Sequence, residues 1–291
     1  MPITDLKDSV EAAVLNIAPE KIELLHEVFD KHQPTFEWPD RAAQLPSVEP
    51  RTGRINIPPA AAELIWAAAH QYWVIYTEYV EDQKAGKHEF DLTANQRRVS
   101  AQLAFTWAQS YFKKPSNPRI AELPAPSYKP VESSDIHVAN ELFLAAIAWI
   151  LHHEVAHLRL NHPSISAISR EEEKEADLEA THWIFSTECT PEERKKRALG
   201  MCVALLVITS IDLESGTFND ASHPKVFDRF DYCLDAVGLE DDHVAYSFAV
   251  LMIRLHLAAG KHDLPEPREV EATFKDLFYD HLYAIHQTQQ A

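Results

Sequence analysis

Hydrophobic and polar positions follow a helical period along most of the chain. Apolar residues recur every three to four positions, which predicts amphipathic or buried α-helices. First-turn prolines at Pro19 and Pro59, and a capping-box pattern from Thr190 to Glu193, mark three helix starts. The predicted helices cover residues 6–17, 19–32, 59–81, 94–112, 141–160, 169–186, 190–213, 241–259 and 266–286, with a shorter helix beginning near 222–224.

β structure is expected in one place only. Residues 33–58 contain five prolines and should be largely irregular, with a small hairpin or edge strand near 47–58. Six glycines among 291 residues also disfavour a turn-rich β architecture. The expected fold class is therefore mainly α.

A second proline-rich stretch, 114–134, bears on domain organisation. It predicts a loop that separates an N-terminal helical region, 1–113, from a region of later helices, 135–291. A loop that crosses one compact domain of residues 1–291 is equally compatible with the sequence.

Composition and charge narrow the functional classes. The three cysteines have no C-x-x-C spacing and are expected to be buried, reduced thiols in a cytoplasmic protein. The first residues lack the basic flank and apolar core of a signal peptide, and the apolar runs are too short to span a membrane. A net charge of −18 argues against a nucleic-acid substrate. Solubility, or a basic partner, would explain that charge equally well.

The predicted helix 141–160 carries the most informative motif. An apolar run from Leu142 to Leu151 leads into the sequence His-His-Glu-Val-Ala-His at 152–157. On a helix, His153 and His157 lie one turn apart on the same face, where two imidazoles can bind one Zn²⁺. Glu154 is then placed to act on a water molecule as general base, which is the HExxH arrangement of zinc peptidases. The alternative is a helix end whose histidines are only solvated or packed.

A peptidase zinc site needs a third protein ligand. A metzincin-type histidine six residues after His157 is excluded, because that position is Pro163. The neighbouring His162 is interpreted as a loop or cap residue. The gluzincin arrangement takes a glutamate from a following helix instead.

Helical geometry selects that glutamate within the predicted helix 169–186. Glu173 shares a face with two small alanines, so it is the acid expected to face the HExxH helix. Asp177, one turn on, is expected to hydrogen-bond a ligand imidazole from outside the metal shell. The solvated side should carry the remaining acids and a histidine: Glu172, Glu175, Glu179 and His182. Of these, Glu172, Glu175 and His182 stay as secondary ligand candidates.

These motifs, together with the segments AIAWILHHE (146–154), EADLEATHWI (175–184) and KKRALG (195–200), resemble the Lit-type phage-exclusion peptidases of bacteria and prophages. The resemblance covers most of the chain before residue 225. It implies a gluzincin-like helical zinc protease whose HExxH residues are His153, Glu154 and His157. It further implies a suicide defence enzyme that cleaves translation elongation factor Tu when a phage-encoded peptide signals infection.

A weaker resemblance is to CAAX-processing gluzincins, in which the motif His-Pro-x-x-x-x-Arg follows the zinc ligands. Here that motif is His223-Pro224-x-x-x-x-Arg229. By this analogy, His223 would donate a hydrogen bond to the oxyanion or cap the zinc in a resting state. An ordinary position in the first turn of a helix is an equally good interpretation of His223.

The expected function is therefore zinc-dependent cleavage of a specific cytoplasmic protein, with one Zn²⁺ per chain and control by a peptide activator. Two alternatives stay open. One is a regulatory metallopeptidase that cleaves a transcriptional repressor. The other is a non-catalytic interaction protein with a structural zinc, which the presence of a base at Glu154 disfavours.

Overall fold

The fold is organised around one long central helix, α5. A computed structural model describes residues 2–87, 89–163, 169–185, 189–215, 224–259, 264–265 and 272–288. Two short 3₁₀ turns precede the first two helices, at Pro2–Leu6 and Pro19–Lys21. The helices are α1 (Lys7–Asn16), α2 (Ile22–His32), α3 (Pro59–Lys84), α4 (Gln96–Lys113), α5 (Asp135–Arg159), α6 (Arg170–Ile184), α7 (Pro191–Ser215), α8 (Val226–Val237), α9 (Val244–Ala259) and α10 (Phe274–Thr288).

The mainly α fold class is thus confirmed, and the strands within the described ranges form one small sheet. The strands are β1 (Thr35–Glu37), β2 (Ser47–Glu49) and β3 (Arg54–Asn56), in the order β1-β3-β2. β2 and β3 pair antiparallel and form the expected hairpin, with Val48 opposite Ile55. β1 pairs parallel with β3 and was not predicted, because a three-residue strand beside prolines has no detectable period.

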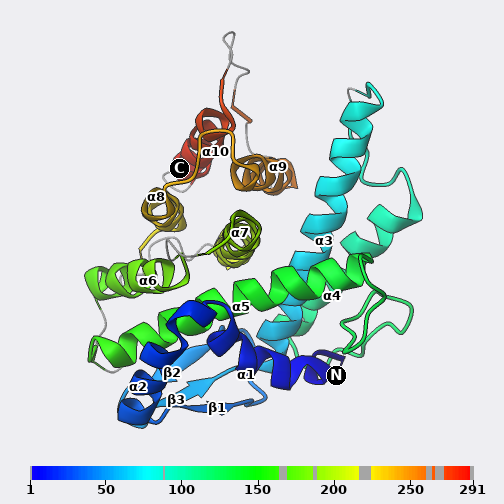
Figure 1. The fold of residues 1–291 in the computed structure, drawn as a ribbon. Helices are drawn as coiled ribbons and strands as arrows, with labels where there is room; N and C mark the ends of the chain where they lie inside the picture. The colour runs from blue at the N-terminus through cyan, green and yellow to red at the C-terminus, as the bar shows by residue number, and fades with distance from the viewer. Residues whose placement is uncertain are drawn as a thin grey trace.

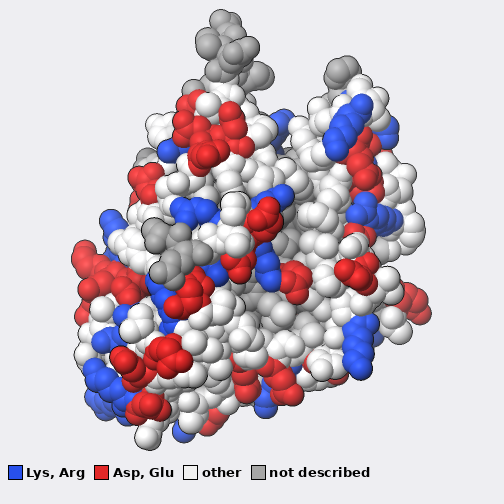
Figure 2. Space-filling model, in the orientation of Figure 1, with Lys and Arg blue, Asp and Glu red and all other residues white. Residues whose placement is uncertain are grey.

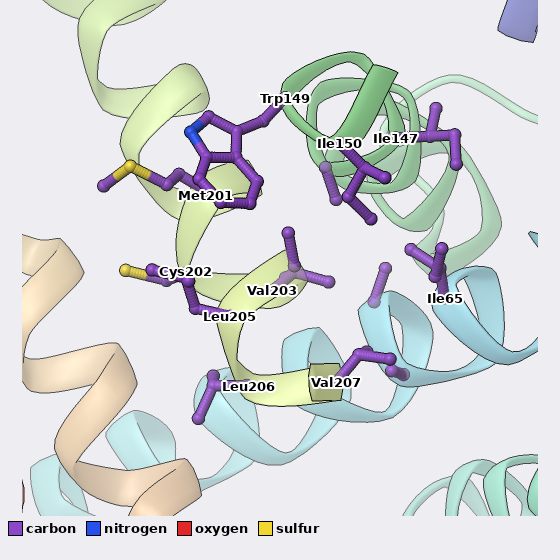
Figure 3. Close-up of a cluster of buried hydrophobic side chains, with 14 of the residues drawn as sticks. Ile65, Ile147, Trp149, Ile150, Met201, Cys202, Val203, Leu205, Leu206 and Val207 are labelled. Carbon is purple, nitrogen blue, oxygen red and sulfur yellow. The ribbon is translucent and has the colours of Figure 1, made fainter. Parts of the chain in front are cut away.

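Helix α5 passes between two groups of elements (Figure 1). The sheet, α1 and α2 lie on one side of it, and α6 and α7 lie on the other, while α3 crosses near its N-terminal half. Figure 3 shows where α3, α5 and α7 meet, with Ile65, Ile147 and Val203 among the buried side chains. Burial of this apolar surface is what holds the helix in place.

Gly200 sets the close approach of α7 to α5. A Cβ atom at this position would lie 2.4 Å from the Cβ of Ala145 and 2.8 Å from its carbonyl carbon. Backbone atoms cannot give way as a flexible side chain does, so a larger residue would push the two helices apart. The glycine that ends the KKRALG segment therefore has a packing function on the helix that carries the HExxH motif.

The apolar character of α5 is explained by this packing. By length and composition it is the one helix within the described ranges that would suffice to cross a membrane. In the fold, however, 72% of its most apolar window is buried inside the protein. Its apolar side chains are therefore covered by other helices.

The tyrosines of α3 also belong to the core. The Tyr72 ring packs against Phe105 and Phe248, and Tyr76 lies edge-on to Phe248. Tyr79 lies edge-on to Phe90. These ring contacts are part of the hydrophobic packing between α3, α4 and α9.

Several helix boundaries differ from the predicted ones. α5 begins at Asp135, six residues before the predicted start, because the Ser134 side chain caps it by accepting from the His137 amide. α10 begins at Phe274 and not at 266; residues 266–271 lie outside the described ranges. The capping box at Thr190 is confirmed. Of the cysteines, Cys202 and Cys233 are buried as expected, whereas Cys189 is half-buried.

The proline-rich loop 114–134 packs against the N-terminal helices. Arg119 donates to the buried carboxylate of Glu63 on α3 and lies over the ring of Trp107 on α4. The Trp107 indole N–H donates to the Pro118 carbonyl, 2.9 Å away. These contacts fix the loop, while the division of the chain into two regions stays a prediction.

Acid should destabilise the fold through His70 on α3. The ring is buried and stacked on Trp66, and burial lowers its pKa from 6.5 to about 4. Between these two pKa values, His70 binds a proton in the unfolded chain but not in the folded chain. Its contribution to the free energy of unfolding is therefore fully present above about pH 6.5 and is lost as the pH falls towards 4. The loss is at most roughly 3 kcal/mol. In urea unfolding at pH 7 and pH 4.5, His70→Phe should show a smaller difference than the wild type. An unchanged difference would show that His70 does not contribute.

Candidate metal centre

Three buried side chains from α5 and α6 converge on one point. The Nε2 atoms of His153 and His157 are 3.1 Å apart. The Glu173 carboxylate lies 3.4 Å from Nε2 of His153 and 3.7 Å from Nε2 of His157. One ligand atom from each residue lies within 4.8 Å of the others. Two imidazole nitrogens and one carboxylate oxygen form a donor set that suits Zn²⁺, so these residues fit a bound metal ion.

Local sequence explains why Glu173 is the acid that faces inward. It lies on the α6 face shared with Ala176 and Ala180, both fully buried, and these small residues allow α6 to approach α5. The secondary ligand candidates, and Glu179 on the same side of the helix, have other partners or face solvent. Glu172 closes a capping box with Ser169, and His182 is exposed. The carboxylates of Glu175 and Glu179 contact His162 and Arg159, respectively.

Glu154 is buried beside this cluster and held by the sheet. One of its carboxylate oxygens accepts a hydrogen bond from the main-chain amide of Val48 on β2, 2.8 Å away. Burial raises the pKa of Glu154 to about 7, and the nearby Glu173 adds to this, while His153 and the Val48 amide oppose it. A carboxyl whose pKa lies near neutrality is suited to accept and return a proton.

Asp177 contacts the His153 imidazole on the side that faces away from His157 and Glu173. Its Oδ1 atom lies 2.8 Å from Nδ1 of His153. The oxygen is out of line with an Nδ1–H, so this is a close electrostatic contact and not a straight hydrogen bond. On α8, Arg229 donates to both Asp177 oxygens, at 2.7 and 2.8 Å, and the Tyr232 hydroxyl also donates to Asp177. Two side chains of α8 therefore hold the Asp177 carboxylate in its position beside His153.

Burial and neighbouring charges together determine the pKa values of Asp177, His153 and His157. Burial would raise the pKa of Asp177, but Arg229 and His153 outweigh it and hold that pKa well below its usual range. Burial would lower the pKa of His153, but Asp177 raises it to about 10. Burial and the neighbouring His153 together lower the pKa of His157 to about 3. A bound metal ion would require both imidazoles to be neutral.

Four functional neighbours were not identified from the sequence. Arg229 was singled out by its spacing after His223 but was given no partner, and Tyr232 lies one helical turn after it. Val48 acts through its amide, for which no side-chain signal exists. His162 was interpreted as a cap, yet its Nδ1 also lies 2.8 Å from Nδ1 of His157. His223, which was considered as an oxyanion donor or a cap on the zinc, lies outside the described residues.

Comparison with known proteins identifies the family of this chain. The family model Peptidase U49 matches residues 55–249, a span that contains the histidines, glutamates, Asp177 and α8 but not β2. The chain is 32% identical over 275 residues, 90% of both chains, to "Cell death peptidase" of Escherichia coli (strain K12). No solved structure matches. With a family model over most of the chain and a relative of this similarity over nearly all of it, the chain belongs to the peptidase U49 family.

Proposed function

We propose that this peptidase is a zinc-dependent endopeptidase whose metal ligands are His153, His157 and Glu173. The observation that carries the proposal is the convergence of their donor atoms within 4.8 Å, in a buried site with Glu154 beside it. An interaction protein with a structural zinc needs no buried carboxyl group held beside the metal ligands. The geometry therefore favours hydrolysis over a purely structural site.

Each residue of the site would have a separate role in peptide hydrolysis. His153, His157 and Glu173 would hold a zinc ion, which when bound would supply Lewis acidity towards water and the scissile carbonyl. Glu154 takes the proton from the attacking water and passes it to the leaving amine. The Val48 amide holds one oxygen of Glu154 in place, which leaves the other free for the proton. Asp177 keeps His153 oriented. His223 stays a candidate donor to the oxyanion, on sequence grounds alone.

We propose further that the enzyme cleaves one cytoplasmic protein under the control of an activator. The support is the likeness to Lit-type phage-exclusion peptidases and to a relative named for cell death. An unrestricted protease would damage the cell's own proteins, so such an enzyme needs a substrate-dependent trigger. Elongation factor Tu is the first substrate to test and a phage-derived peptide the first activator. A repressor-cleaving regulatory peptidase is the alternative.

Metal analysis provides the first test. Protein purified without chelator should contain one zinc per chain, and Glu173→Ala should lose it because two imidazoles alone bind weakly. Glu179→Gln serves as the control, since Glu179 lies on the same helix and pairs with Arg159. Inductively coupled plasma mass spectrometry measures the content. Full occupancy in Glu173→Ala would refute this ligand assignment.

The substrate is tested by comparing intact proteomes of bacteria that express the wild type or an inactive variant. One new cleavage, seen only with the wild type and the trigger, is the expected result. Free digestion of casein by the purified wild type would instead indicate a general peptidase and refute the proposed selectivity.

A further inference from the structure

We propose that His162 and Glu175 are positioning residues that hold His157 in its metal-binding orientation. This inference rests on the proposed metal site and extends it beyond the ligands and Asp177. His162 is 7% exposed, and its Nδ1 atom lies 2.8 Å from Nδ1 of His157. On its other side, Nε2 of His162 lies 3.3 Å from the Glu175 carboxylate. The contacts therefore lead from a ligand imidazole through a second imidazole to an acid at the surface.

The way α5 ends explains why His162 lies there. Asn161 adopts a left-handed conformation, with φ of 56°. The chain then turns back, so that the His162 amide donates to the His157 carbonyl at 3.0 Å and the Asn161 amide donates to the Leu158 carbonyl at 3.2 Å. This is the pair of bonds in a Schellman motif. The turn that terminates the helix thus brings the His162 ring back beside the ring of His157.

The direction of each hydrogen bond follows from metal binding. A neutral His157 that binds a metal through Nε2 carries its proton on Nδ1 and must donate it. Nδ1 of His162 is then the acceptor, so the His162 proton lies on Nε2, where the Glu175 carboxylate accepts it. A single tautomer at each ring satisfies all the contacts. Glu175 sets the tautomer of His162, and His162 in turn fixes the ring of His157.

The two ligand histidines therefore have different outer contacts. His153 faces a carboxylate that Arg229 and Tyr232 hold in place within the core. His157 faces a neutral imidazole whose supporting acid is 60% exposed. The outer contacts of His157 therefore extend to the protein surface, whereas those of His153 stay in the core.

Zinc affinity, measured by competition with a chromogenic chelator, tests the inference apart from activity. His162→Ala should weaken zinc binding on the order of 10–100-fold, the effect typical of lost outer partners of metal ligands. His162→Asn should recover most of the affinity, because the Asn amide oxygen can accept where Nδ1 of His162 did. Thermal unfolding of the metal-free proteins monitors the fold, since a purely structural role would alter stability without this rescue.

Glu175 is tested with a charge-matched control. Glu175→Gln should weaken zinc binding by up to about fivefold, equivalent to ~1 kcal/mol, because this acid is exposed. Glu171→Gln removes the same charge from an exposed position in the first turn of α6 and should change nothing. A Co²⁺-substituted protein should show an altered visible spectrum in His162→Ala but not in Glu171→Gln.

The outcomes separate this inference from the proposed function. Wild-type zinc affinity in His162→Ala would overturn the positioning role and leave the metal site intact. Equal weakening in His162→Ala and His162→Asn would also overturn it, since the hydrogen bond would then not be the cause. A wild-type protein that binds no zinc would refute the proposed function itself.

Discussion

Glu154→Gln should reduce peptide cleavage by roughly 10²–10⁴-fold, the usual contribution of general acid–base catalysis, while zinc content stays at the wild-type level. The Gln amide oxygen can still accept from the Val48 amide, so the contact between β2 and α5 survives. What disappears is a carboxyl able to exchange a proton near neutral pH. The measurement is the initial rate of cleavage of the identified substrate, at matched zinc occupancy.

The control for this substitution is Glu179→Gln, which removes a carboxylate from α6 outside the site and should cleave like the wild type. A Glu154→Gln enzyme with more than about a tenth of the wild-type rate would show that another group accepts the proton. Loss of zinc together with activity would instead place Glu154 among the ligands.

Arg229→Met should destabilise the metal-free protein by about 3–5 kcal/mol. Asp177 is fully buried, and Arg229 donates two hydrogen bonds to it from within the core. Removing the guanidinium leaves a buried carboxylate without its main countercharge, which is the costly case for buried ion pairs. Urea denaturation at pH 7 measures the change in the free energy of unfolding.

The double variant Arg229→Met/Asp177→Asn distinguishes charge from packing. It removes both charges, so it should recover a large part of the lost stability. If the double variant is no more stable than Arg229→Met alone, the loss comes from packing of the arginine side chain against Trp149 and not from the unpaired carboxylate.

The cluster of His153, His157 and Glu173 could be predicted because the helical period determines which side chains share a face. The four-residue interval places His153 beside His157, and the alanines of α6 mark the side that carries Glu173. Its distance to both imidazoles agrees with this prediction.

The contacts that could not be predicted involve chain reversals and distant segments. His162 reaches His157 because a left-handed residue turns the chain back, and sequence spacing does not show that reversal. Arg229 reaches Asp177 across 52 positions. Val48 reaches Glu154 across 106 positions through a main-chain amide. Such long-range pairs depend on how helices pack, which a local pattern does not encode.

The hydrogen bond from the Val48 main chain to Glu154 does not depend on which side chain occupies position 48. A main-chain donor is retained by every residue except proline, so the side chain at position 48 can vary freely among residues that fit the core. Alanine scanning would therefore detect only lost packing at this buried position, and comparison of relatives would show only a buried apolar site. Substitution of the side chain at position 48 therefore does not test the hydrogen bond to Glu154, whereas proline or a backbone ester at this position would remove it.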